Sequence, residues 1–233
     1  MTYRGKLLPE AYTALWNLSR SGMRVIPVTG RPAGWCDLIA RFWPVAGVIG
    51  ENGAFAFYME ENRMKRMYHP LADREGVKDR LDGLWERVHR AVPESRIAAD
   101  QFSRLFDLAV DYREEPPLLD DQAADGIKKA CEAEGARAKI SSIHVNAWFG
   151  DYDKLSMTQI FFSQRYPEAN MTSDVLFVGD SPNDEPMFAF FPLSCGVGNI
   201  RNFLPSMKVK PAFITSGEGS YGFAELAERL LSF

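Results

Sequence analysis

The most informative segment of the 233-residue chain is Val175-Leu-Phe-Val-Gly-Asp180-Ser-Pro-Asn183-Asp184. The apolar run predicts a buried strand, and Gly179 and Asp180 follow at its carboxyl end. Carboxylate oxygens are the ligands that Mg²⁺ prefers, so Asp180 and Asp184 are candidate metal ligands, with Asn183 as a hydrogen-bonding partner. Because the same residue types favour turns and helix caps, this segment alone leaves a plain strand-to-helix turn open.

The sequence around this stretch alternates between strand and helix patterns. Helices are predicted over residues 8–18, 32–42, 155–166 and 221–231 and from Asn183, and strands over 23–29, 46–49, 175–178, 193–197 and 213–214. This alternation predicts an α/β fold with a Rossmann-like, mostly parallel sheet covered by helices on both faces. The buried stripe of the second helix is expected to be Trp35, Leu38, Ile39 and Phe42. Residues 54–59 and 64–69 read as a hairpin.

The middle of the chain has a different character. Its predicted elements are a charged helix over about 73–91, a strand within 104–112, a helix over 120–134 with an acidic cap, and strands near 138–142 and 143–148. Such a block predicts a separate small α+β layer. We therefore expect a core made of residues 1–70 and 150–233, with an inserted domain over 71–149.

Two further segments suggest chemistry at the ends of core strands. Val25-Ile-Pro-Val-Thr29-Gly30-Arg31 places a hydroxyl and backbone N–H groups at a strand-to-helix turn, where phosphate oxygens can be held. Lys154 opens a helix and would offset the charge of a phosphoryl group. The alternatives are an ordinary capped turn for Thr29 and a solvated side chain for Lys154.

Composition excludes several classes of partner. The net charge is −4, from 27 basic and 31 acidic residues, with no basic run, so neither nucleic acid nor an anionic membrane is expected as a partner. Three widely spaced cysteines, no signal-peptide core and no membrane-length apolar run predict a cytoplasmic protein with reduced thiols. The sequence leaves the oligomeric state open.

Taken in order, these motifs resemble the haloacid dehalogenase superfamily, and within it the Cof-type and sucrose-phosphatase-like branch. The resemblance rests on Thr-Gly-Arg after a strand, Glu-Asn-Gly-Ala from Glu51, an inserted module, Lys154, and Gly-Asp-x-x-Asn-Asp from Gly179. It covers the chain from Gly5 to the segment before the last helix. It implies a Rossmann-like core with a small α+β cap inserted after the third core strand.

The resemblance also implies roles for individual residues. Thr29, with the Gly30–Arg31 turn, would bind the transferring phosphoryl group, and Lys154 would stabilise both nucleophile and phosphate. Asp180 would bind Mg²⁺ with support from Asp184, and Asn183 would help to position the phosphate. Asn52 would lie near the cap, where substrate can touch it.

The family's first motif has no counterpart in this chain. Relatives begin with a strand that ends in Asp-x-Asp-Gly-Thr, whose two aspartates are the nucleophile and the general acid–base. This sequence begins where that motif ends, so roughly ten residues, enough for one strand, are expected to be absent. That strand would lie between the strands ending at Thr29 and Asp180, and each would be left with an unpaired edge. We expect a start upstream of Met1.

The predicted activity of the complete protein is magnesium-dependent hydrolysis of a small phosphorylated metabolite, such as a sugar or polyol phosphate, through an aspartyl-phosphate. The chain as it stands is expected to show little or no turnover. Two alternatives remain open: phosphomannomutase-like phosphoryl transfer, and ligand binding by a catalytically dead relative. The sequence gives less support to a plain nucleotide-binding module, because no phosphate-binding glycine motif follows a strand. Cap candidates for specificity are Arg104, Arg113, His144 and Asn146.

Overall fold

A computed structural model describes residues 2–3, 5–72 and 75–232. The chain divides into two compact units, each built from several segments. The first unit contains Met1–Pro27, Phe42–Gly47 and Gln159–Phe233, and the second contains Val28–Arg41 and Val48–Thr158. Among the described residues, no helix is both long enough and apolar enough to cross a membrane.

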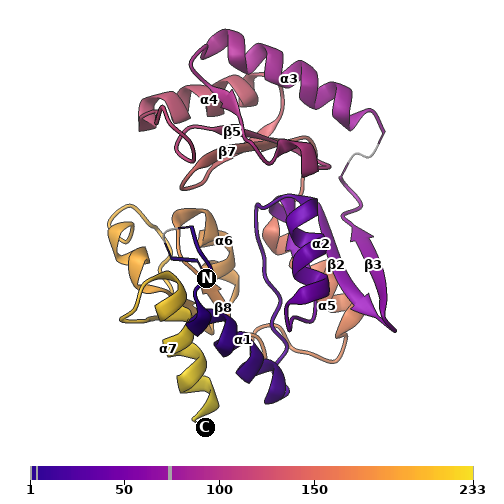
Figure 1. Cartoon of the computed structure of the whole chain (residues 1–233), viewed down its shortest axis with the longest axis vertical. Coiled ribbons are helices and arrows are strands. Elements are labelled where there is room, and N and C mark those ends of the chain that lie inside the picture. Colours follow the sequence, from indigo (N-terminus) through magenta and orange to yellow (C-terminus); the bar gives the residue numbers. More distant parts are fainter. Residues whose placement is uncertain (1, 4, 73–74, 233) are drawn as a thin grey trace. The chain divides into compact units, whose positions relative to one another are not determined.

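The first unit is built around two packed helices and a short parallel sheet. Helices α1 (Pro9–Arg20) and α7 (Gly219–Leu231) lie side by side (Figure 1), and residues such as Leu15 and Phe223 form the core between them. The sheet has the order β10-β9-β8, with β8 at Phe177–Gly179, β9 at Ser194–Gly196 and β10 at Phe213–Ile214, all parallel. Helix α6 (Glu185–Phe190) follows β8 and packs Phe188 against Phe177.

The second unit contains an antiparallel sheet of the order β1-β2-β3. Its strands are β1 (Val48–Gly50), β2 (Phe55–Glu60) and β3 (Arg63–Tyr68). The β2–β3 turn has two residues with positive φ, Glu61 at 49° and Asn62 at 59°, which suits the tight hairpin predicted here. Val28 forms one parallel bridge with Ile49, and helix α2 (Ala33–Phe42) follows.

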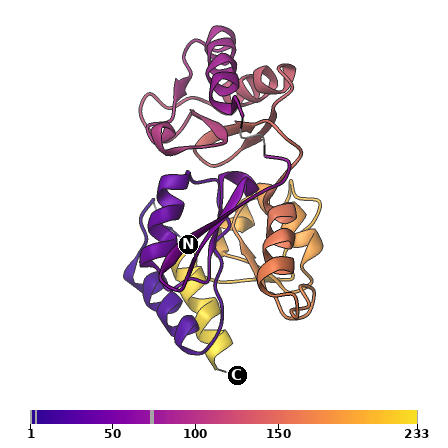
Figure 2. The same ribbon diagram turned by 90° about the vertical axis from the view of Figure 1, so that its right-hand side faces the viewer.

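The predicted α+β layer lies in the same unit and is a four-stranded antiparallel sheet with two helices. The strand order is β4 (Arg96–Ile97), β5 (Asp107–Asp111), β7 (His144–Trp148) and β6 (Arg137–Ile140). Helices α3 (Val77–Ala91) and α4 (Asp121–Ala133) cover one face of it (Figures 1 and 2), burying Leu108, Val110 and Val145. Asp73, the predicted start of the first helix, lies outside the described residues.

Alternation along the strands decides what the other face of this sheet carries. Successive side chains of a strand point to opposite faces. Because Leu108 and Val110 face the helices, Asp107 points the other way, and Asn146 of β7 does the same between Val145 and Ala147. This face of the small sheet is therefore polar although it is buried.

The predicted strand over residues 23–29 is wrong in its extent. Only Val28 is in a strand pairing, and the boundary between the two units falls just before it, after Pro27. Proline cannot donate a ladder hydrogen bond, and a short buried strand needs neighbours on both edges. Among the described residues, Val28 has one strand neighbour, β1, and β8 likewise has one, β9.

The predicted buried face of α2 is also wrong. Trp35, Leu38 and Phe42 are 49%, 52% and 71% exposed, whereas Ile39 is buried. The helix instead buries Ala33, Cys36 and Ala40 beside Ile39. Small side chains allow a helix to approach its neighbours closely, so the buried face follows size as well as hydrophobicity.

Candidate active site

Thr29 and Gly30 form the turn between the Val28 bridge and α2. The Thr29 N–H donates to the Ile49 carbonyl at 2.9 Å, which extends the pairing with β1 by one bond. The Thr29 Oγ1 accepts a hydrogen bond from the Arg31 N–H at 3.1 Å. Since a hydroxyl has one proton to donate, this arrangement leaves the Thr29 O–H available as a donor.

A second turn, Glu51–Gly53, lies directly against the first. Glu51 and Asn52 have positive φ values of 42° and 57°, which asparagine tolerates better than most residues. The Asn52 N–H donates to the Thr29 carbonyl at 3.2 Å. A β-carbon at Gly30 would lie 3.0 Å from the Asn52 Oδ1, so glycine at that position allows the close approach.

Lys154 is brought to the same place by the start of helix α5 (Lys154–Arg165). Asp153 caps this helix: its Oδ1 accepts from the Ser156 N–H at 2.8 Å, and the Ser156 Oγ accepts from the Asp153 N–H at 3.0 Å. This reciprocal pair is a capping-box arrangement. The backbone of Asp153 and Lys154 lies so close to Gly53 that a β-carbon there would be 2.0 Å from the Asp153 carbonyl oxygen.

The Glu51 carboxylate connects the two turns to the small sheet. It is fully buried and accepts hydrogen bonds from three backbone N–H groups, those of Ala33, Leu105 and Phe106, at 2.6–3.1 Å. Burial, followed by the negative charge of Asp107, raises the pKa of Glu51 to about 8, and the three donors act in the opposite direction. A single side chain thus fixes α2, the Glu51–Gly53 turn and the entry to β5.

Asp107 is the centre of a buried polar network on the inner face of that sheet. Arg104 Nη1 donates to both of its oxygens, at 2.9 and 3.1 Å. Asn146 Nδ2 and Asn52 Nδ2 donate to Oδ2, at 3.1 and 3.4 Å. The network is closed to solvent, with Asp107 0% exposed, because its donors surround both carboxylate oxygens.

Arg31 is held by carboxylates at the edge of this network. Its Nη1 lies 3.4 Å from Asp100 Oδ2 and 3.3 Å from Glu114 Oε1, and its guanidinium lies over the Trp35 ring at 4.6 Å. Glu114 also contacts the buried His144, with 2.7 Å between Oε2 and Nε2. The pKa of His144 is lowered, mainly by burial, and the negative charge of Glu114 acts in the opposite direction.

The Asp180 segment belongs to the first unit. Asp180 follows β8 and is exposed, and the short helical turn Pro182–Asp184 returns the buried Asp184 toward it. The Asp184 Oδ2 accepts from the Asp180 N–H at 3.1 Å, and the Ser181 hydroxyl donates to the Asn183 Oδ1 at 2.8 Å. A β-carbon at Gly179 would lie 2.8 Å from the Asp184 carboxylate, which explains glycine before Asp180.

The donor chemistry of this segment fits a magnesium ion. No group of three or more His, Cys, Asp or Glu side chains suited to a metal occurs in the part of the chain that the structure describes. Mg²⁺ is commonly bound through one or two carboxylates, with waters and substrate phosphate as the other ligands. Asp180 and Asp184, four residues apart at one turn, supply two such carboxylates.

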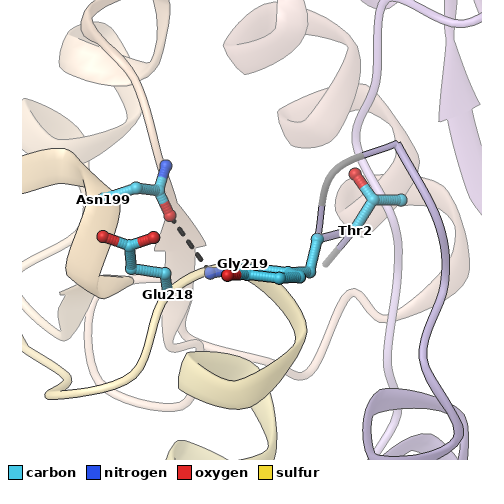
Figure 3. A pocket seen from close by; sticks show the side chains of 5 residues that line it. Thr2, Asn199, Glu218 and Gly219 are labelled. Carbon is cyan, nitrogen blue, oxygen red and sulfur yellow. Dashed lines mark hydrogen bonds between the residues drawn. The ribbon is translucent and has the colours of Figure 1, made fainter.

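A shallow cavity of about 300 Å³ lies near Asp180 in the same unit. Its described lining is Thr2, Tyr3, Asn199, Glu218 and Gly219 (Figure 3). Asn199 joins it to the Asp180 segment: its Nδ2 donates to the Asp180 carbonyl at 3.3 Å and its Oδ1 accepts from the Gly219 N–H at 3.1 Å. The charged side chain in this lining is the carboxylate of Glu218, whose negative charge disfavours phosphate binding in the cavity.

Comparison with solved structures identifies the fold. A protein from Thermoplasma acidophilum superposes with a TM-score of 0.69 at 18% identity, over 95% of this chain and 89% of its own. A haloacid dehalogenase-like hydrolase from Bacteroides thetaiotaomicron gives 0.68 at 16% identity, over 99% and 95%. A subclass IIB sugar phosphatase of the same superfamily gives 0.65 at 11% identity, over 97% and 93%. The chain has the haloacid dehalogenase-like fold. No family model and no curated protein matches it.

The haloacid dehalogenase-like fold predicted from the motifs is thus confirmed, and the second unit brings five of the predicted site residues together. Thr29, Gly30, Arg31, Asn52 and the backbone of Lys154 are joined by the contacts described above. The predicted metal and phosphate residues Asp180, Asn183 and Asp184 form a separate group in the first unit. Their roles remain predictions.

Several residues of the polar network were not predicted. Of the cap candidates, Arg104, His144 and Asn146 lie in or beside the network, whereas Arg113 pairs with Asp121 at the surface.

Four carboxylates of this region were not predicted from the sequence: Glu51, Asp100, Asp107 and Glu114. A signal was present for one of them: Asp107 and Asp111 share one face of an otherwise apolar strand, as His144 and Asn146 do.

Proposed function

We propose that the natural protein is a magnesium-dependent phosphomonoesterase that acts on a small phosphorylated metabolite, a sugar or polyol phosphate. The observation that carries this proposal is the Thr29 turn. Its hydroxyl is left as a donor by the Arg31 N–H, and the start of α5 with Lys154 packs against the adjoining turn. Hydroxyl, amide and ammonium donors at one place suit a phosphate group. Phosphatases of the same fold among the solved structures support it.

Asp180 and Asp184 are proposed to hold Mg²⁺, and Asn183 to help orient the phosphate. Bound Mg²⁺ would neutralise charge on the phosphoryl oxygens. Thr29 would donate its hydroxyl proton to a phosphate oxygen, and the Lys154 ammonium would oppose the remaining negative charge.

The nucleophile is proposed to be an aspartate of the complete protein. Its carboxylate would take the phosphoryl group from the substrate oxygen to form an aspartyl-phosphate, and water would then attack phosphorus and release phosphate. We propose that this chain by itself binds phosphate with little or no turnover.

A hydroxyl-rich substrate would reach the polar face of the small sheet only by displacing internal hydrogen bonds, because this network is closed to solvent. Amide and carboxylate groups from Asn52, Asp107 and Asn146 meet beside the Thr29 turn. Amides and carboxylates pair well with hydroxyls, both as donors and as acceptors. Because these groups are bonded to one another in this structure, a substrate hydroxyl would replace an existing hydrogen bond.

The test compares this chain with the protein extended upstream in its natural reading frame. Both are assayed with Mg²⁺ for phosphate release from sugar phosphates, polyol phosphates and an aryl phosphate. We expect release by the extended protein alone, lost in Asp180→Ala and retained in the matched surface variant Asp174→Ala. Equal release by both chains would contradict the proposed nucleophile. A well-folded extended protein without activity on any substrate would contradict the function.

A further inference from the structure

The peptide group between Gly30 and Arg31 is bonded at both of its polar ends. Its carbonyl oxygen, on Gly30, accepts from Arg104 Nη1 at 3.0 Å. Its N–H, on Arg31, donates to the Thr29 Oγ1 at 3.1 Å. A peptide group is planar, so the directions of its C=O and N–H are fixed relative to each other. An interaction that holds the carbonyl therefore also aims the N–H at the threonine oxygen.

The rotation of the Thr29 hydroxyl depends on this N–H. When one lone pair of Oγ1 accepts from Arg31, the O–H bond is restricted to the remaining directions around the oxygen. Without the acceptor role, the hydroxyl would rotate among its staggered positions and could turn its proton toward the backbone. The Arg31 N–H thus prepares the hydroxyl to donate to a ligand.

Arg104 is itself held firmly enough to serve as an anchor. Its side chain is 1% exposed. The guanidinium donates to Asp107 through Nη1 and to Asp100 through Nε and Nη2, at 2.9–3.3 Å. A planar group with five donors can make all these bonds and still reach the Gly30 carbonyl, which a lysine ammonium cannot do.

We propose that Arg104 is a positioning residue for the phosphate site: it orients the Thr29 hydroxyl through the Gly30–Arg31 peptide group. This inference rests on the proposed function, because it assumes that Thr29 binds phosphate. Arg104 touches neither the phosphate nor the threonine. Arg104, in the loop that leads into β5, would thus control a turn that precedes it by 74 positions.

A purely structural role for Arg104 predicts a different result. If it only braces the fold, its replacement adds to any loss caused at Thr29, because the two effects are independent. If it acts through the Thr29 hydroxyl, its replacement has no effect once that hydroxyl is gone. A double-mutant cycle separates the two.

The experiment measures the affinity of the chain for inorganic phosphate, with Mg²⁺ present, by calorimetry. The variants are Thr29→Val, Arg104→Lys and the double variant, and Arg113→Lys is the matched control, an arginine of the same sheet region bonded elsewhere. Lysine keeps the charge that faces Asp107. We expect each single variant to bind phosphate about tenfold more weakly, as the loss of one hydrogen bond predicts, and the double variant to equal Thr29→Val.

A second measurement needs no ligand. The exchange rate of the Arg31 amide hydrogen reports its bond to Thr29 directly, and we expect faster exchange in Arg104→Lys and unchanged exchange in Arg113→Lys. Asp107→Asn, which loosens Arg104 but keeps the guanidinium, replaces Arg104→Lys if that variant does not fold.

Two outcomes overturn the inference, and they are distinguishable. Additive losses, or an Arg104→Lys variant with unchanged phosphate affinity and Arg31 exchange, would show that Arg104 does not act through Thr29. An unchanged affinity in Thr29→Val would instead remove the phosphate role of Thr29, and the proposed function with it, even if Arg31 exchange still responds to Arg104→Lys.

Discussion

Gly53 and Asp153 are in direct backbone contact, and this contact fixes where Lys154 begins its helix. A β-carbon on Gly53 would lie 2.0 Å from the carbonyl oxygen of Asp153, and the residue has a φ of +106°. Glycine therefore satisfies two requirements at once, a left-handed backbone and a close approach.

Replacing this glycine is expected to weaken both stability and phosphate binding. Gly53→Ala forces a strained φ and separates the turn from α5, with a loss of at least about 1–3 kcal/mol in the free energy of unfolding. Gly83→Ala is the control: Gly83 lies within α3 with no atom near its added methyl group, and alanine there stabilises by roughly 0.5–1 kcal/mol. Urea unfolding measures both. Equal stabilities of the two variants would contradict the contact.

Glu51→Ala is expected to be among the most destabilising substitutions in the chain. It leaves the backbone N–H groups of Ala33, Leu105 and Phe106 without their acceptor. Each buried unsatisfied donor costs about 1–3 kcal/mol, so the free energy of unfolding should fall by several kcal/mol. Glu132→Ala removes an exposed pair with Lys128 and should cost less than about 0.5 kcal/mol. A Glu51 variant as stable as the Glu132 variant in urea would refute this role.

The buried His144 is expected to contribute a loss of folding stability in mild acid. Burial lowers its pKa in the folded protein below the ordinary value of 6.5. As pH falls below about 6.5, the unfolded chain gains a proton at His144 that the folded protein does not. The stability contributed by His144 is therefore present above this pH and is lost below it. The pKa of His69 is lowered in the same way by burial. The raised pKa of Glu51 acts in the opposite direction, because it makes stability fall as pH rises toward 8. The contribution of His144 is therefore the difference in slope between the unmodified chain and His144→Gln.

The measurement for this prediction is the urea midpoint between about pH 5 and 8. His89→Gln serves as the control, because His89 lies exposed on α3 against Trp85. If His144→Gln and His89→Gln change the slope equally, burial of His144 is not its cause.

Replacing either carboxylate of the Asp180 turn is expected to weaken the binding of Mg²⁺. Asp184→Asn keeps an oxygen for the Asp180 N–H but removes a charge, and should weaken Mg²⁺ binding by about 10–100-fold. Asp180→Asn should weaken it further. Asp174→Asn, at an exposed turn of the same unit, should leave the affinity unchanged. Calorimetric titration distinguishes the three, and equal affinities throughout would argue against this metal site.

The fold was predictable from the sequence where the pattern is local. The β2–β3 hairpin, the acidic cap of α4 at Asp120 and the strand at Phe213–Ile214 follow from turn residues and periodicity. The extent of the strand predicted over 23–29 was wrong, because strand pairing depends on neighbouring segments that a single stretch of sequence does not reveal. The exposed Trp35 shows the same limit, since its environment is set by packing against other segments.

The candidate site was predictable only in part for a related reason. Thr29 and Asn52 follow strand ends, so their residue types and positions are visible in the sequence, and the structure joins them. The pairs Glu51–Phe106, Asp107–Asn146 and Asp107–Asn52 join residues 39–55 positions apart, and no local pattern specifies such pairings. Alternating polar residues in β5 and β7 indicate a polar buried face but not its connection to the Thr29 turn.

The proposed function requires both Thr29 and Asp180 for phosphate binding. The test is a titration of the protein with inorganic phosphate, followed by ³¹P NMR with and without Mg²⁺. We predict one saturable binding event that requires Mg²⁺ and is weakened by Thr29→Val and by Asp180→Asn alike. Binding that is indifferent to Mg²⁺, or that responds to only one of the two substitutions, would contradict the claim.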